Sequence, residues 1–165
     1  LADLMTADFP IPPDQAVDLI STGMAAVGPT VAVGLHCCAP CDVATMLESG
    51  PQVISIALSA DLVEYAGYLG RFISNGGVIA WGVLPTGAPS LSKPDRYWRE
   101  LSDVWCLLVE RGVDPAMLRR QSMVTPVCGL AGHQVSNARR IARLSAEIGQ
   151  KVKAQAMSTR LALGA

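Results

Sequence analysis

The sequence predicts an α/β domain in which four strand–helix units form a parallel sheet. Short apolar segments rich in β-branched residues alternate with segments of helical periodicity, and glycine or proline turns separate them. Such alternation favours parallel strands joined by right-handed crossovers. The 165 residues suffice for one hydrophobic core, so we expect a single domain over residues 1–165. Four units amount to half of a TIM-type (β/α)8 barrel, which needs about 250 residues in full. An open four-stranded sheet is the competing architecture.

The first half of the chain predicts three helices and two strands. Proline at a first helical turn, apolar residues at three- and four-residue steps, and glycine at the ends mark the helices. The third helix has Asp61 as its predicted N-cap and closes at Asn75-Gly76-Gly77. In chain order the predicted elements are a helix over 12–27, a strand over 30–35, a helix over 40–48, a strand over 52–58 and a helix over 61–75.

The second half predicts two further strands and their helices. A near-continuous apolar strand is followed by the long polar loop 85–93, and Ser92 with Pro94 resembles a helix cap and first helical position. Tryptophans at helical spacing in the next segment predict a core-facing stripe. The elements are a strand over 78–84, a helix from Pro94, a short helix over 115–120, a strand over 122–127 and a helix over 132–156.

Composition narrows the class of function. Half of the residues are hydrophobic and 16% are charged, against about 25% in an ordinary domain, which suggests burial against a partner. The net charge of −1 argues against a nucleic-acid or anionic-membrane partner, and no apolar run is long enough to span a bilayer. Five cysteines, three of them within five positions, make a poor disulfide framework. We therefore expect a cytoplasmic protein with a metal or reactive-thiol site.

Candidate metal ligands lie at the predicted carboxyl ends of the first and last strands. His36 and Cys38 are two residues apart, so in extended chain their side chains point the same way, whereas Cys37 points to the opposite side and is expected to pack. Cys128 follows the last strand and should meet them, because parallel strands all end at one face. One imidazole and two thiolates suit zinc, and three protein ligands with one open position form the catalytic arrangement. Cys41 is a candidate fourth ligand.

These residues carry a resemblance to a known family. His36-Cys37-Cys38 after one strand, the segment 52–57 on the next, and Pro126-Val127-Cys128-Gly129-Leu130 after the last resemble the catalytic barrel of cobalamin-independent methionine synthase. Corrinoid-linked zinc methyltransferases of the uroporphyrinogen decarboxylase-like superfamily share the pattern. The resemblance implies the C-terminal half of that barrel, strands five to eight, with His36, Cys38 and Cys128 binding zinc.

In that family zinc activates a small-molecule thiol for methylation, so the resemblance implies a methyltransferase of methionine biosynthesis. It also implies a methyl donor, and a partner that is either the missing N-terminal half-barrel or a second copy. The chain departs from the family at two places. Ala57 stands where the family carries a zinc-ligand glutamate, and the segment 78–85 lacks the family's catalytic histidine.

Two other functions remain open on the sequence. Cys38-Ala39-Pro40-Cys41 is a Cys-x-Pro-Cys segment before a predicted helix, as in dithiol oxidoreductases. A half-barrel could also be a non-catalytic assembly piece. Cys106 is expected to pack within its helix, and His133 to act as a surface or capping group.

Overall fold

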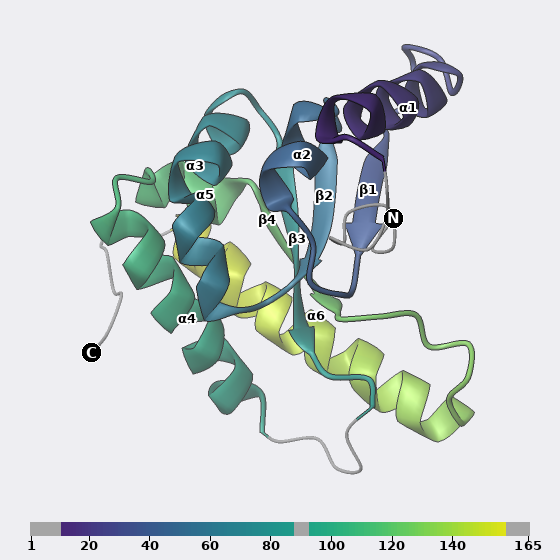
Figure 1. Cartoon of the computed structure of the whole chain (residues 1–165). Helices are drawn as coiled ribbons and strands as arrows, with labels where there is room; N and C mark the ends of the chain where they lie inside the picture. Colours follow the sequence, from purple (N-terminus) through teal and green to yellow (C-terminus); the bar gives the residue numbers. More distant parts are fainter. Residues whose placement is uncertain (1–10, 88–92, 158–165) are drawn as a thin grey trace.

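The computed structural model describes residues 11–87 and 93–157, which form an α/β fold around a four-stranded, all-parallel sheet (Figure 1). The strands lie side by side in chain order, β1-β2-β3-β4, so no crossover skips a neighbour. Their bounds are Gly34–Cys37 for β1, Val53–Ala57 for β2, Val78–Leu84 for β3 and Ser122–Pro126 for β4. The predicted parallel α/β fold is confirmed.

Helices fill each connection between the strands. The helix α1 precedes the sheet, and α2, the 3-10 helix η2 with α3, and α4 with α5 follow successive strands (Figure 1). Their bounds are Pro13–Ala25 for α1, Val43–Glu48 for α2, Ala60–Tyr65 for η2, Ala66–Ser74 for α3, Pro94–Glu110 for α4, Pro115–Arg120 for α5 and Val135–Met157 for α6.

One face of β1 and β2 packs into the core and the other remains more open. Leu35 and Cys37 are buried on β1, whereas Gly34 and His36, which alternate with them, are exposed. Burial alternates in the same way along β2, where Ile54 is buried. The period of two is that of extended chain, so the sequence assigns His36 to the open face.

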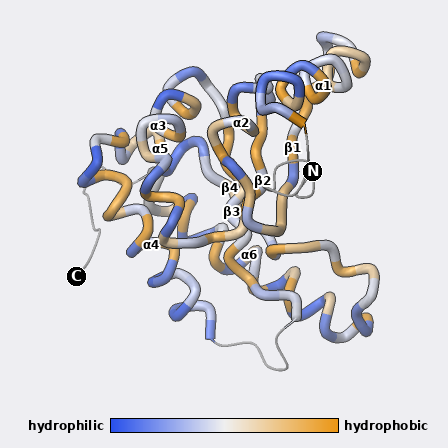
Figure 2. Tube along the Cα trace, viewed as in Figure 1, coloured by the Kyte–Doolittle hydropathy of each residue, from blue (hydrophilic) through white to orange (hydrophobic). Residues whose placement is uncertain are grey.

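Aromatic packing joins β3 to α4. Trp81 of β3 and Trp105 of α4 are almost fully buried, with ring centroids 6.3 Å apart in an edge-to-face arrangement. Trp98 lies edge-to-face on the other side of Trp105, at 6.2 Å. Hydrophilic and hydrophobic residues alternate along α4 in Figure 2, as expected for a helix with one buried side. The predicted core role of this tryptophan stripe is confirmed.

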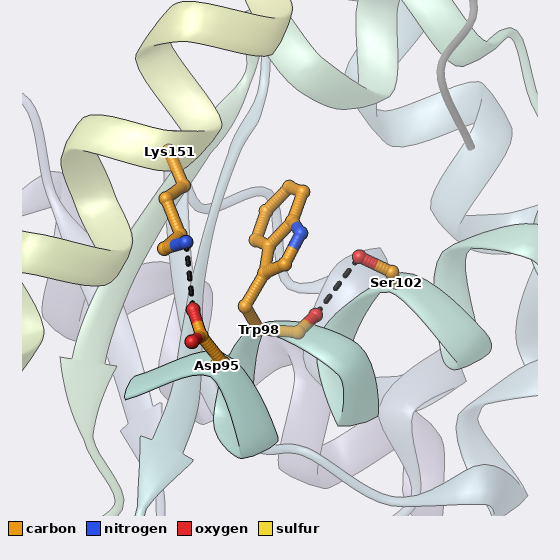
Figure 3. Close-up of polar contacts among 4 residues, drawn as sticks. All are labelled: Asp95, Trp98, Ser102 and Lys151. Carbon is orange, nitrogen blue, oxygen red and sulfur yellow. Dashed lines mark hydrogen bonds and ion pairs between the residues drawn. The ribbon is translucent and has the colours of Figure 1, made fainter. Parts of the chain in front are cut away.

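The exposed ends of α4 and α6 meet beyond that core. The Lys151 ammonium of α6 donates to the Asp95 carboxylate of α4 at 2.9 Å, and Trp98 projects from α4 beside this pair (Figure 3). The Ser102 hydroxyl donates to the Trp98 carbonyl at 2.8 Å, within the same helix. Because both partners of the ion pair are solvent-exposed, its contribution to stability is small, about 0–1 kcal/mol.

The first strand begins later than predicted. The sequence suggests a strand over 30–35, but β1 starts at Gly34, where its pairing with Val53 begins. In the segment that leads into β2, Pro51 lies just before this point and has no N–H to donate. Instead, Val33 N–H donates to the Gln52 side chain at 2.7 Å, and the Val33 carbonyl accepts from Gln52 N–H at 2.9 Å. The start of the strand is therefore set by its neighbour.

Three predicted helix starts also differ. The helix α2 begins at Val43 rather than residue 40, because the Asp42 carboxylate caps it by accepting from Ala44 N–H. The N-cap of η2 is Ser59 rather than Asp61: the Ser59 hydroxyl accepts from Asp61 N–H. The last helix begins at 135 rather than 132, after a turn. The predicted Ser92 cap lies outside the described residues.

Candidate metal centre

The site is built where β1 ends and where the chain leaves β4. His36 lies on the open face of β1, and Cys38 follows the strand directly. Cys128 follows β4 by two residues. Both thiols are exposed, and no disulfide involves either of them. The carboxyl ends of parallel strands share one face of the sheet, which brings these distant segments to one place.

The three predicted ligands come together. The Cys128 thiol donates to the Cys38 sulfur across 3.4 Å, although the two residues are 90 positions apart. One nitrogen of His36 and the two sulfurs all lie within 4.8 Å of one another. Zn–S and Zn–N bonds are about 2.0–2.3 Å long, so a small inward movement of the side chains would bring all three ligand atoms within bonding distance of one ion. His36, Cys38 and Cys128 could therefore bind a metal ion.

The approach of Cys128 depends on a glycine in β3. A β-carbon on Gly82 would lie 3.0 Å from the Ile56 carbonyl oxygen and 3.0 Å from Val127 Cα, both backbone atoms. Val127 N–H donates to the Leu84 carbonyl at 2.9 Å, and the pairing of β3 with β4 shifts register between Gly82 and Leu84. The missing side chain thus allows the chain leaving β4 to lie close to β2 and β3, immediately before Cys128.

A serine on the neighbouring strand orients the histidine. His36 and Ser55 are register partners in the β1–β2 pair, and His36 Nδ1 lies 2.9 Å from the Ser55 hydroxyl oxygen. With Nδ1 held by this contact, Nε2 is the nitrogen available to a metal. Metal-binding histidines commonly use one ring nitrogen for the metal and the other for such a hydrogen bond. Sequence reasoning missed Ser55, although it is the one polar residue in the segment Val53–Ala57.

The contact between the two thiols favours the protonated form of Cys38. The hydrogen bond with Cys128 raises the pKa of Cys38 above the ordinary thiol value. Repulsion from negative charge on the neighbouring sulfur shifts the pKa of Cys38 in the same direction. A bound divalent cation would displace the thiol protons, because metal binding to cysteine requires the thiolate. Metal affinity at this site should consequently rise with pH.

The candidate fourth ligand lies elsewhere. Among the described residues, Cys41 does not join the group of three. It is half-buried against the core, and loss of solvent, followed by a hydrogen bond with Cys37, raises its pKa to about 12. Cys37 is buried, as predicted, and its thiol donates to the Ala39 carbonyl at 3.3 Å. The four clustered cysteines therefore form two pairs, Cys38 with Cys128 and Cys37 with Cys41.

The other positions singled out in the sequence, Cys106, His133 and Ala57, do not contribute ligands to this group of three. Cys106 lies within α4, and His133 Nδ1 is 3.4 Å from the Asn137 amide nitrogen one helical turn away. Ala57, at the end of β2, supplies no ligand atom, but it lines the same cavity as Cys38. That cavity has a volume of about 430 Å³ and also borders Ser59, Asp61 and Tyr65. It provides room for a small molecule beside the cysteine.

No family model, curated protein or solved structure matches this chain. None of the helices in the described ranges is both long enough and apolar enough to cross a bilayer.

Proposed function

We propose that the chain is half of a (β/α)8 barrel in which His36, Cys38 and Cys128 hold a catalytic zinc ion for methyl transfer to a thiol. The observation that carries the proposal is the meeting of one imidazole nitrogen and two sulfurs within 4.8 Å. This donor set suits zinc, and three protein ligands leave a fourth position for substrate. The resemblance of the His36-Cys37-Cys38 and Cys128 motifs to those of cobalamin-independent methionine synthase supports this reaction class.

The half-barrel assignment is supported by the order of the strands. The spatial order of the strands, β1-β2-β3-β4, continues in one direction, whereas a doubly wound sheet reverses its strand order at a switch point. One-way winding is how a closed barrel is built. Both β1 and β4 are edges of the described sheet. We propose that a second half-barrel, either an N-terminal half or another copy of this chain, covers these edges.

The residues of the site divide the chemistry among them. His36 would bind through Nε2 while Ser55 fixes its ring, and the two cysteines would bind as thiolates after releasing their protons to solvent. Bound zinc would lower the pKa of a thiol at the open position and keep it as the nucleophilic thiolate. The substrate sulfur then forms a bond to the methyl carbon, and the donor leaves with the electron pair of the bond that breaks.

The dithiol oxidoreductase alternative requires Cys38 and Cys41 to act as a pair. Cys38 instead lies against Cys128, and Cys41 lies against Cys37. A high pKa also makes Cys41 a weak nucleophile at neutral pH, because the thiolate is the reactive form. This arrangement favours the metal site over a Cys-x-Pro-Cys redox centre.

Metal analysis with thiol titration tests the proposal. We expect about one zinc per chain that disappears in Cys128→Ser and persists in Cys106→Ser, which alters a thiol outside the group. The cobalt-substituted protein should then show a stronger sulfur-to-cobalt charge-transfer band when a small thiol is added. Metal binding without any response to thiols would indicate a structural site. No metal in the reduced protein would overturn the proposal.

A further inference from the structure

The two cysteines of the metal group also form a pair suited to oxidation. Their sulfurs lie 3.4 Å apart, while a disulfide bond is about 2.05 Å long, so a small approach of the two side chains would join them. Both thiols are exposed, so a small oxidant can reach them. Cys37, in the neighbouring pair, is buried. Access therefore selects one thiol pair over the other.

We infer that Cys38 and Cys128 form a reversible disulfide whose formation excludes the metal, so that the site is a redox switch. This inference concerns the regulation of the proposed zinc site and rests on that proposed function. A disulfide sulfur is no longer a thiolate ligand, and His36 alone would remain of the three ligands. Oxidation would thus remove two of the three protein ligands in one step.

The oxidant is a low-molecular-weight disulfide such as oxidised glutathione. One protein thiolate attacks a sulfur of the oxidant, breaks its S–S bond and releases one small thiol. The second protein sulfur then attacks the first in this mixed disulfide and releases the other small thiol. The two protein thiols give up two protons and two electrons, and the oxidant takes them up as two thiols. A dithiol reductant reverses both exchanges.

The position of the two cysteines gives the switch a structural consequence. Cys38 follows the edge strand β1, and Cys128 follows the opposite edge strand β4. A bond between them would link segments 90 residues apart where the two strands end. In the oxidised chain, the segment after β1 would be covalently joined to the segment after β4, and the site would hold no metal.

The test treats the reduced chain, with and without zinc, with oxidised glutathione and maps the disulfides by peptide mass analysis. A chromophoric chelator follows zinc release in the same sample. We expect one Cys38–Cys128 bond, one zinc released for each bond formed, and full zinc binding again after reduction. Cys41→Ser should behave like the unaltered chain, because Cys41 lies outside the group. Cys128→Ser should lose the bond.

The outcomes separate this inference from the proposed function. A Cys38–Cys41 bond, or no internal disulfide, would overturn the redox switch while leaving zinc binding by the reduced chain intact. Zinc retained by the oxidised chain would overturn it as well. A reduced chain that never binds zinc would overturn the proposed function and the switch together, and the mapped bond in that chain would then reveal a plain dithiol pair.

Discussion

His36 and Ser55 face each other across the first two strands, with the imidazole Nδ1 2.9 Å from the serine hydroxyl oxygen. The contact fixes the ring on the open side of β1 and directs the choice of nitrogen for a metal. It links the register of the sheet to the geometry of the site, because a one-residue slip of β2 would replace the serine with an isoleucine from the buried side.

Removal of the Ser55 hydroxyl should weaken metal binding without unfolding the chain. We expect Ser55→Ala to lower zinc affinity by about 10- to 100-fold, the usual cost of losing a partner of a metal-binding histidine. Ser55→Thr, which keeps a hydroxyl, should recover most of the affinity. The measurement is competition with a chromophoric chelator. The matched control is Ser59→Ala, which removes the cap of η2 and should lower stability but leave zinc affinity unchanged.

A fourth protein ligand could be added at the end of β2. Ala57 lies two residues after Ser55, on the same side of the strand, and it lines the same cavity as Cys38. We expect Ala57→Glu to tighten zinc binding by roughly tenfold, or about 1.4 kcal/mol, because a carboxylate completes a four-ligand set. Ala57→Gln, of nearly equal size but a poorer ligand, should give no gain. Equal affinities of the two variants would show that the side chain does not reach the metal.

The glycine of β3 offers a test of how the site is assembled. Gly82→Ala would place a β-carbon against two backbone atoms, so the chain leaving β4 must shift. We expect a loss of about 1–3 kcal/mol in the free energy of unfolding, the usual cost of overpacking, together with weaker zinc binding by Cys128. Gly67→Ala is the control, since a β-carbon there meets no atom within 4 Å. Denaturant unfolding and chelator competition measure the two effects.

Much of the fold follows from local signals in the sequence. The strand Val78–Leu84 and the helix Pro115–Arg120 have the predicted bounds. Asn75-Gly76-Gly77 and Pro85 flank the strand, and Pro115 marks the first position of the helix. The predicted start of β1 was wrong because the strand begins where its pairing with β2 begins. That pairing depends on residues distant in the sequence. The predicted N-cap of η2 was wrong because Ser59 and Asp61 are both good capping residues, and only the observed turn selects between them.

The site was predictable in outline from parallel topology. Strands that end at one face bring Cys128 to Cys38, as the observed sulfur contact shows. The role of Ser55 needed the register, which the sequence does not specify. The location of Cys41 also could not be read from spacing, because Asp42 caps α2 after it and the thiol packs towards the core. The spacing of histidine and cysteine thus predicted the three candidate ligands, but it did not predict Ser55, which orients the histidine.

The buried thiol of Cys41 should make stability depend on alkaline pH. Its pKa is raised from an ordinary 9.0 to about 12, chiefly by loss of solvent. The unfolded chain therefore ionises this thiol at lower pH than the folded chain does. The stabilising contribution is fully present below pH 9, and it is lost progressively as the pH rises from about 9 towards 12.

Substitution of Cys41 isolates this effect. We expect the free energy of unfolding of the metal-free chain, measured with urea at pH 8 and pH 10.5, to fall more for the unaltered protein than for Cys41→Ala, which has no group to ionise there. The comparison uses the difference between the two pH values, so the packing lost with the sulfur cancels. Because Cys106 is also half-buried, Cys106→Ala serves as the control for a thiol outside this pair and should keep the full decrease. Equal decreases in the unaltered and Cys41→Ala proteins would show that the Cys41 thiol ionises as readily in the folded chain as in the unfolded one.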